Sequence, residues 1–197
     1  HLDHLGKGGS GSLAPGSTDI HWGADDNASG TAGLLELAQA VAAKRQDLKR
    51  SIVFIAFSAE ELGLLGSAFY TENPFLPLDS TITMVNLDMI GRLRQLHLLV
   101  GGTGTAANWE TMLRQQHDGE LDLEFDRSGL APSDHASFYR RNIPVLFFHT
   151  GRHSDYHKPS DTVDKINDVE TNVGPSGEKS SPADDVRILK VTVEERS

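Results

Sequence analysis

The sequence predicts an α/β domain built on a mostly parallel, twisted sheet with helices on both faces. Two observations support this prediction. The short runs at 52–57 and 143–148 have the length of strands and are apolar on both faces, as strands buried in a parallel sheet are. Segments with helical spacing of apolar residues alternate with such runs, which is typical of a sheet covered on both sides. The length of 197 residues suits one such domain with a short appendage.

The predicted elements begin with a strand end at residues 1–5 and a Gly- and Ser-rich loop at residues 6–18. An amphipathic helix follows at 30–44, because its apolar residues recur every three or four positions and Ser29 or Asn27 can cap its start. The remaining elements are a central parallel strand at 51–57 (SIVFIAF), a helix at 62–70, strands at 81–87 and 96–100, a helix at 108–117, a strand at 121–125, a helical turn at 136–140 and a strand at 143–149.

The last part of the chain differs in composition. Residues 172–185 (NVGPSGEKSSPADD) have the composition of a linker, and residues 186–193 alternate loosely like a strand. We therefore expect a folded domain over residues 1–170, followed by a linker and strand-like tail over residues 171–197.

The composition excludes several functional classes. Lys and Arg number 18 against 28 Asp and Glu, a net charge of −10, which disfavours nucleic-acid binding because phosphates are bound mainly by cationic side chains. No stretch approaches the roughly 18 consecutive apolar residues that a membrane-spanning helix needs. The chain has no Cys, so disulfides, thiolate metal sites and a cysteine nucleophile are excluded. Any metal site must therefore use His, Asp and Glu.

Residues that can bind metals or transfer protons follow several of the predicted strands. In parallel sheets, ligands bind beyond the carboxyl ends of the strands. We therefore expect these side chains to gather at one end of the sheet. They are His1 and Asp3 at the end of the first strand, Glu60 and Glu61 after the strand at 51–57, Asp88 after the strand at 81–87, and His157 in the loop after the strand at 143–149.

These residues lie in four short segments, and a fifth contains the adjacent aspartates Asp25 and Asp26. In chain order the segments are HLDH at 1–4, GADDNASG at 23–30, SAEELGLLGS at 58–67, NLDMIG at 86–91 and SDYHKPSDT at 154–162. Their order and content resemble the M28 family of zinc metallopeptidases, which are co-catalytic aminopeptidases. Each segment is a weak signal alone, but all five in this order form a specific pattern. The resemblance extends from residue 1 to about residue 167 and implies a zinc-peptidase/phosphorylase-like three-layer sandwich.

The resemblance implies two metal ions held by five residues. Asp25 would bridge the two ions. His1 and Asp88 would complete the site of one ion, and Glu61 and His157 the site of the other. Two imidazoles and three carboxylates suit Zn²⁺ best, with cobalt or manganese as alternatives.

The resemblance also implies the catalytic groups. Glu60 would be the general base on a metal-bridging water and would return the proton to the leaving amine. Tyr156, beside His157, matches a tyrosine with which the family donates to the developing oxyanion. Asp3 would accept a hydrogen bond from the far nitrogen of His1 and fix its tautomer.

Several of these acidic residues also have a simpler structural interpretation. Glu60 and Glu61 could favour the positive end of the helix that follows them. Asp25, Asp26 and Asn27 could be turn and capping residues, and we expect this role for Asp26 but not for Asp25. The family has a cis peptide bond after its bridging aspartate, which predicts one at Asp25–Asp26.

Three histidines near the end of the domain are spaced four residues apart, as on one face of a metal-binding helix. Gly151 and Pro159 argue against a helix there. We therefore expect only His157 to bind a metal. His153 is expected to line the pocket, and His149 to be a structural residue at a strand end.

The resemblance implies a di-zinc aminopeptidase that releases N-terminal residues from peptides with a free amino terminus. Two alternatives stay open: a glutaminyl-cyclase-like acyltransferase with a single zinc, and a non-catalytic binding domain of the same fold. A secreted or periplasmic location is implied, although no signal peptide is visible. Family members have one or more strands before the position of His1, so we expect the metallopeptidase domain to belong to a fragment or a rearranged chain.

Overall fold

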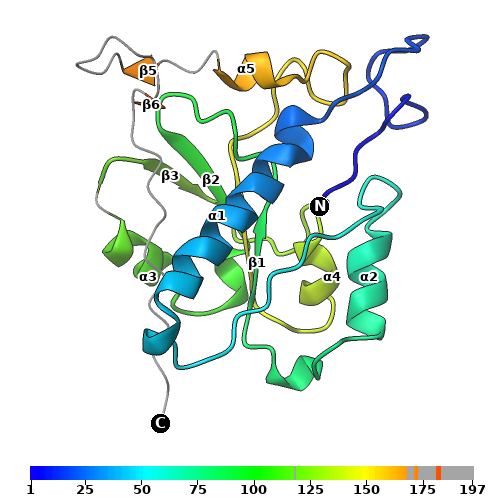
Figure 1. The fold of residues 1–197 in the computed structure, drawn as a ribbon. Coiled ribbons are helices and arrows are strands. Elements are labelled where there is room, and N and C mark those ends of the chain that lie inside the picture. Colours follow the sequence, from blue (N-terminus) through cyan, green and yellow to red (C-terminus); the bar gives the residue numbers. More distant parts are fainter. Residues whose placement is uncertain (118, 168–170, 173–180, 183–197) are drawn as a thin grey trace.

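The computed structural model describes residues 1–117, 119–167, 171–172 and 181–182. A four-stranded sheet lies at its centre, with the strands in the order β1-β4-β2-β3 (Figure 1). The strands are β1 (Met84–Leu87), β2 (His97–Gly101), β3 (Asp122–Phe125) and β4 (Val145–His149).

The sheet is mixed but mostly parallel, in line with the prediction of a mostly parallel sheet. β1 pairs with β4 and β2 with β3 in parallel, whereas β2 and β4 are antiparallel. In the first pair, Leu87 lies opposite Phe148. β1 and β4 therefore end at the same edge of the sheet, so Asp88 and the segment after His149 emerge together there.

Helices surround this sheet. In chain order they are α1 (Gly30–Ala43), α2 (Leu65–Glu72), α3 (Trp109–Gln116), α4 (His135–Tyr139) and α5 (Val163–Asn167), with a π-helical turn η1 (Ala24–Ser29) and the 3₁₀ turns η2 (Arg45–Asp47), η3 (Leu78–Ser80) and η4 (Thr103–Thr105).

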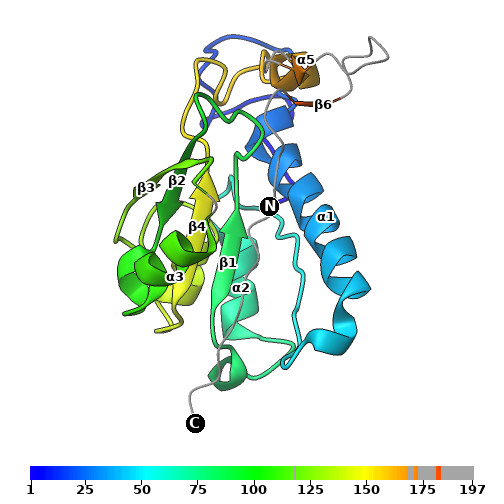
Figure 2. The same ribbon diagram turned by 90° about the vertical axis from the view of Figure 1, so that its left-hand side faces the viewer.

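β4 contributes to a hydrophobic core on each face of the sheet, because successive side chains of a strand point to opposite faces. Val145 packs with Phe138 of α4 on one face. Leu146 packs with Leu113 of α3 on the other face. Figure 2 shows α1 and α3 on opposite sides of the strands. The sheet is therefore covered on both faces, as the alternation of strands and helices predicts.

Two glycines let α1 approach the end of β1 closely. A Cβ on Gly30 would lie 2.4 Å from the carbonyl oxygen of Leu87, and one on Gly33 would lie 2.6 Å from Ile90 Cδ1. Any larger residue would push the helix away from the sheet. This close packing brings the turn before α1, which contains Asp25 and Asp26, next to Asp88.

Two predicted strands are wrong. Residues 1–5 form no strand, although Gly6 makes an isolated bridge with His21. Residues 51–57 are not paired into the sheet among the described residues, and the side chains of Ile52 and Val53 are about half exposed. The two segments touch through the backbone N–H of Leu2, which donates to the carbonyl of Phe57 at 2.8 Å. An apolar, β-branched run favours a strand, but a strand forms only where a neighbouring chain completes the hydrogen bonds.

The tail contains one short pair of strands within the described residues. β5 (Thr171–Asn172) and β6 (Ser181–Pro182) are antiparallel, so part of the segment predicted as a linker is paired. The strand predicted at 186–193 lies outside the described residues. Among the described residues, no helix combines the length and apolar character needed to cross a membrane.

Candidate metal centre

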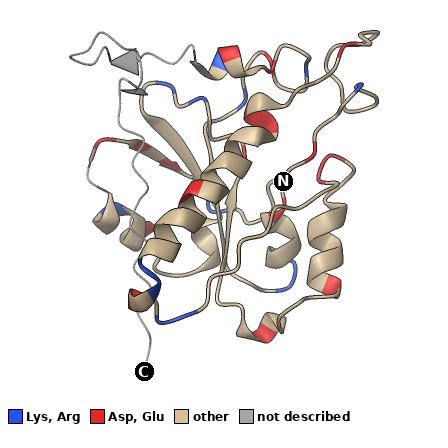
Figure 3. Ribbon diagram, viewed as in Figure 1, with Lys and Arg blue, Asp and Glu red and all other residues tan. Residues whose placement is uncertain are grey.

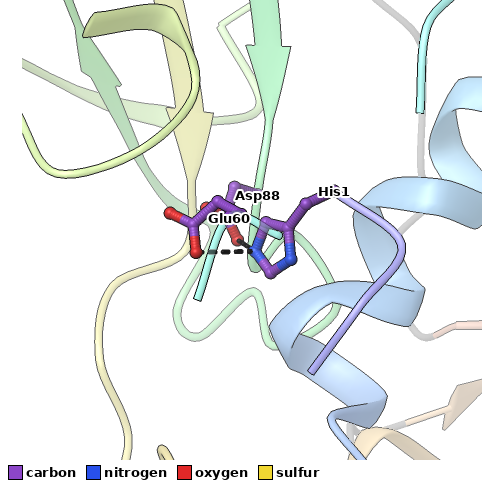
Figure 4. A group of neighbouring side chains, drawn as sticks. All are labelled: His1, Glu60 and Asp88. Carbon is purple, nitrogen blue, oxygen red and sulfur yellow. Dashed lines mark ion pairs between the residues drawn. The ribbon is translucent and has the colours of Figure 1, made fainter. Parts of the chain in front are cut away.

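His1 lies against the carboxylates of Glu60 and Asp88 at the carboxyl end of β1 (Figure 4), and a third carboxylate, that of Asp26, also faces it. Nε2 of His1 is 3.2 Å from Asp26 Oδ1, 3.4 Å from Asp88 Oδ1 and 3.7 Å from Glu60 Oε2. His1, Asp26 and Asp88 are all less than a tenth exposed. Figure 3 shows several loop segments with Asp or Glu near the amino terminus. The sequence therefore brings His1, Glu60 and Asp88 together, as expected from their positions.

His157 faces the other side of the same group. Its Nε2 is 3.2 Å from Asp26 Oδ2 and 3.3 Å from Glu61 Oε2. The two oxygens of Asp26 therefore face different histidines, His1 and His157. A carboxylate in this position has the geometry needed to bridge two cations.

This position was expected for Asp25, but the structure places Asp26 there. The Asp25 carboxylate turns away: Oδ1 accepts a hydrogen bond from the Gly91 N–H at 2.7 Å, and Oδ2 lies 3.2 Å from Nε2 of His153. The cis peptide bond is correspondingly Asp26–Asn27 and not Asp25–Asp26. Adjacent side chains of a turn point in different directions, and the run of two aspartates does not reveal which one faces the histidines.

His153 is therefore a structural partner of Asp25, and its side chain is fully buried there. The expectation that it lines the pocket is wrong. His149 is the last residue of β4 and stacks on Phe147 with 4.5 Å between ring centroids, in line with its expected structural role.

Backbone groups fix the tautomers of the two facing histidines. Nδ1 of His157 lies 2.8 Å from the carbonyl oxygen of Gly11, and Nδ1 of His1 lies 2.9 Å from the carbonyl oxygen of Asp3. Nδ1 is therefore the donor to a backbone carbonyl in each ring, and Nε2 faces the carboxylates. The acceptor expected for His1 was the Asp3 carboxylate, which lies farther away, at 3.9 Å. That carboxylate instead accepts a hydrogen bond from the Glu60 N–H at 3.3 Å.

Asp88 is oriented by a polar chain from the neighbouring loop. The hydroxyl of Ser133 donates to Asp88 Oδ2 at 2.7 Å. Asn86 Nδ2 in turn donates to the Ser133 oxygen at 2.7 Å, and all three residues are buried. Asp88 Oδ1 is left facing His1. Sequence reasoning missed this role of Ser133, because nothing near it in the chain points to Asp88.

The turn that carries Asp26 is held by Asp161, another residue that sequence reasoning missed. Asp161 Oδ2 accepts hydrogen bonds from the backbone N–H groups of Asp25 at 3.0 Å and Asp26 at 3.1 Å. Its Oδ1 binds Arg92 at 2.7 Å. Asp161 lies in the same SDYHKPSDT segment as His157, a signal that could have identified it.

The site contains more acidic than basic side chains, and their burial together shifts the pKa values of Glu60 and His1. Burial raises the pKa of Glu60, the neighbouring carboxylates of Asp88 and Glu61 add to the effect, and the pKa reaches about 8 although His1 opposes the shift. Burial alone would lower the pKa of His1, but its contacts with Asp26 and Asp88 raise it to about 12. The group carries more carboxylates than the histidines can neutralise.

The donor atoms fit a pair of divalent cations. Asp88 Oδ1 and Glu61 Oε1 are buried and have no hydrogen-bond partner among the described residues. Buried carboxylate oxygens without partners are costly unless a cation compensates them. Imidazole nitrogens and carboxylate oxygens are common ligands of Zn²⁺. The residues present therefore suit zinc.

Tyr156 lies beside this group. Its ring stacks on His157 with 3.8 Å between centroids, and the guanidinium of Arg152 lies 5.0 Å from its ring centre. Burial and the nearby carboxylates raise the pKa of Tyr156 to about 12, so its hydroxyl keeps its proton at neutral pH.

Known proteins that are similar in sequence to this chain include aminopeptidases. Aminopeptidase YwaD of Bacillus subtilis (strain 168) is 33% identical over 158 residues, which cover 73% of this chain and 33% of that protein. Leucine aminopeptidase 2 of Trichophyton rubrum is 28% identical over 184 residues, which cover 77% of this chain and 36% of that protein. The chain thus spans about a third of the length of these relatives.

Solved structures share the fold. An aminopeptidase from Aneurinibacillus sp. strain AM-1 superposes with a TM-score of 0.58 at 35% identity, over 73% of this chain and 35% of that chain. BSAP, a zinc aminopeptidase from Bacillus subtilis, superposes with a TM-score of 0.56 at 31% identity, over 72% and 37%. The sequence model of peptidase family M28 matches residues 1–173. With this match over most of its length, the chain belongs to peptidase family M28.

Proposed function

We propose that this chain carries the catalytic centre of a di-zinc aminopeptidase that releases N-terminal residues from peptides. The observation that carries the proposal is the Asp26 carboxylate, which has one oxygen facing His1 and the other facing His157. The names of the relatives support the reaction class, and the chemistry of the donors supports zinc.

The proposed ligands divide into two sets that share Asp26. His1, Asp26 and Asp88 would hold one ion, and Asp26, Glu61 and His157 the other. Zinc bound there supplies a Lewis acid that polarises the scissile carbonyl. The hydrogen bonds from Ser133 to Asp88 and from His157 to the Gly11 carbonyl hold these ligands in place before an ion arrives.

Glu60 is the proposed general base. Its carboxylate stands next to His1, with 3.7 Å between the two groups, and its pKa of about 8 suits a group that takes up and releases protons near neutral pH. It would take the proton from the attacking water and deliver it to the nitrogen of the leaving amine. Its own backbone N–H is fixed on Asp3, which holds the carboxylate at the edge of the group.

Tyr156 is the proposed donor to the developing oxyanion. Its stacking on His157 places it at the side of the group, and its phenol is protonated at neutral pH. The many carboxylates also suit a substrate with a protonated amino terminus, because they offer negative charge to it.

The test is hydrolysis of a leucine chromogenic anilide by the zinc-loaded full-length protein and by its Glu60→Gln variant. We expect turnover to fall by about 10²–10⁴-fold with the zinc content unchanged, since Glu60 is a proton carrier and not a ligand. Glu72→Gln is the matched control. Glu72 is an exposed residue at the end of α2, paired with Arg141 at 3.5 Å, and its loss should leave turnover unchanged.

Metal content separates the competing functions. Wild-type protein that binds two zinc ions but turns over no aminoacyl anilide would contradict the proposed substrate class. A single zinc per chain would favour the cyclase-like alternative, and no zinc would favour a non-catalytic binding domain.

A further inference from the structure

His157 is held by a loop from the first part of the chain. The loop, residues 7–20, contains no helix or strand and is part of the dark blue segment that runs out from the N-terminus in Figure 1. Its Gly11 carbonyl oxygen lies 2.8 Å from Nδ1 of His157. Its Leu13 N–H donates to the carbonyl oxygen of His157 at 2.9 Å. The loop therefore contacts both the ring and the backbone of this proposed ligand.

The backbone of His157 has a conformation that needs such contacts. Its φ is 53°, in the left-handed region that residues other than glycine rarely adopt. A conformation of this kind persists where the surrounding structure fixes it. The direction of the His157 ring toward Asp26 and Glu61 thus depends on the shape of the loop at residues 7–20.

A hydrogen-bond chain through His21 fixes the shape of this loop. His21 is buried, and its backbone N–H donates to the Gly6 carbonyl at the base of the loop at 2.6 Å. Its Nε2 lies 2.7 Å from the Ser12 hydroxyl, and its Nδ1 lies 3.1 Å from the Asp19 carbonyl oxygen. The Ser12 oxygen also accepts the Ala14 N–H at 3.0 Å. The chain therefore connects the middle of the loop with both of its ends.

One tautomer of His21 satisfies every member of this chain. With its proton on Nδ1, the ring donates to the Asp19 carbonyl and accepts the Ser12 hydroxyl proton at Nε2. A lone pair of the Ser12 oxygen then remains for the Ala14 N–H. Gly8 leaves room for the ring, since a Cβ there would lie 2.9 Å from Cε1 of His21. Polar networks in which every group has a partner make the segments that they connect rigid.

We propose that Ser12 and His21 are positioning residues for the zinc ligand His157. This role depends on the zinc binding proposed above. Ser12 lies between Gly11 and Leu13, the two residues that contact His157, so the hydrogen bond from Ser12 to His21 fixes both contacts together. A ligand that is already oriented binds its ion more tightly, because less conformational freedom is lost on binding. Neither Ser12 nor His21 is itself a zinc ligand.

The test compares zinc binding by the full-length protein and its Ser12→Ala variant during dialysis against graded concentrations of a chelator. We expect one of the two zinc affinities to fall by about 10–100-fold, as for other residues that orient a metal ligand through a hydrogen bond. Unchanged affinities would overturn the positioning role. Far-ultraviolet circular dichroism of the metal-free proteins shows whether they are folded.

A double-mutant cycle shows whether Ser12 acts through His157. In a His157→Gln background, Ser12→Ala should cause no further loss of zinc affinity, because the ring that Ser12 orients is absent. A purely structural role of Ser12 would weaken zinc binding by the same factor in both backgrounds. That result would overturn the positioning role.

Ser17→Ala is the matched control. Ser17 belongs to the same loop, but its hydroxyl donates to Asp19 Oδ2 at 3.3 Å and accepts the Asp19 N–H at 3.2 Å, at the protein surface. Its substitution should leave both zinc affinities at the wild-type values. An equal loss of affinity in Ser17→Ala and Ser12→Ala would contradict a specific role of Ser12.

Amide hydrogen exchange of the metal-free wild type gives a second answer that needs no variant. The N–H groups of Leu13 and Ala14 should be protected before zinc is added, because their hydrogen bonds do not depend on the ion. Exchange as fast as in an unstructured peptide would overturn the positioning role. If wild type binds two zinc ions and cleaves the anilide while any of these contrary results is found, the role of Ser12 and His21 fails and the proposed function stands. If wild type binds no zinc, both fail.

Discussion

Arg92 and Asp161 form a buried ion pair, with Nη2 of Arg92 2.7 Å from Oδ1 of Asp161. Nη1 of the same guanidinium binds Asp155 at 2.7 Å. Because Asp161 also accepts the backbone N–H groups of Asp25 and Asp26, this pair connects three segments: the turn before α1, the loop after β1 and the loop that carries His157. No atom of the pair lies among the proposed ligands, yet it supports the backbone that presents them.

Asp161→Asn should therefore be strongly destabilising. It removes one of the two counter-charges of the buried Arg92 guanidinium and leaves only Asp155, and breaking a buried pair costs up to about 3–5 kcal/mol. Denaturant unfolding of the metal-free protein measures this change in the free energy of unfolding. The control is Arg127→Gln, which breaks the exposed pair with Glu110 at 2.9 Å and should cost less than about 1 kcal/mol. If the two variants lost the same free energy of unfolding, the supporting role of Asp161 would be contradicted.

The adjacent aspartates should respond differently to the same substitution. Asp26→Asn removes the charge between His1 and His157, and we expect zinc binding and turnover to be lost together. Asp25→Asn keeps an oxygen for the Gly91 N–H, so zinc should stay bound while the free energy of unfolding falls by about 1–3 kcal/mol. Zinc content by mass spectrometry and denaturant unfolding measure the two effects. If only the Asp25 variant lost zinc, Asp25 and not Asp26 would be the shared zinc ligand.

Tyr156→Phe should lower kcat and leave zinc content unchanged. Removal of one donor to a developing oxyanion costs about 10²–10³-fold in kcat. The phenyl ring can still stack on His157, so that histidine should keep its place. Steady-state kinetics with the leucine anilide separate kcat from KM. A rise in KM at unchanged kcat would assign Tyr156 to substrate binding instead.

The contribution of His135 to the stability of the metal-free protein should fall in mild acid. Burial lowers the pKa of this histidine to about 4, against 6.5 for an exposed one, so the unfolded chain takes up the proton first. The stabilisation is therefore complete above about pH 6.5 and is lost as the pH falls toward 4, by about 2 kcal/mol between pH 7 and pH 5. Urea unfolding of wild type and His135→Gln at both pH values measures it, and the variant should lack this part of the pH dependence.

His97→Gln provides the opposite sign for comparison. The hydrogen bond with Asp122 raises the pKa of the exposed His97, so its contribution is present at low pH and is lost as the pH rises. If His135→Gln and His97→Gln changed the pH dependence in the same direction, the explanation based on burial of His135 would be wrong.

Much of the sheet could be predicted because its strands are local in the sequence. The β-branched and aromatic runs that become β1 and β4, and the helical spacing that becomes α1, each fix their own conformation over a few residues. The run at 51–57 has the same local character, and its prediction as a strand was wrong. Strand pairing depends on segments that are distant in the chain, and the apolar pattern of a segment does not identify its pairing partner.

The site shows the same limit at the level of single side chains. Asp88 and His157 could be placed together because they follow β1 and β4, which end at one edge of the sheet. Glu60 also lies there, although the segment before it is not a strand of the sheet. The choice between Asp25 and Asp26 could not be made, since it depends on the direction of each side chain in one tight turn. The roles of Ser133, Asp161 and Arg92 depend on contacts between loops that are distant in the chain. The spacing of residues in the sequence does not reveal such contacts.

The shared carboxylate of Asp26 has a further consequence, because His1 and His157 lie near opposite ends of the described chain. Ions seated between them would close nearly the whole domain into a ring, in a chain that has no cysteine to do so. A covalent link closing a ring of about 100 residues restricts the unfolded chain by about 5 kcal/mol, and a metal bridge restricts it in a similar way while it stays bound. The proposed catalytic ions would then also stabilise the fold as a cross-link does. A chelator would remove this cross-link, just as a reductant breaks a disulfide.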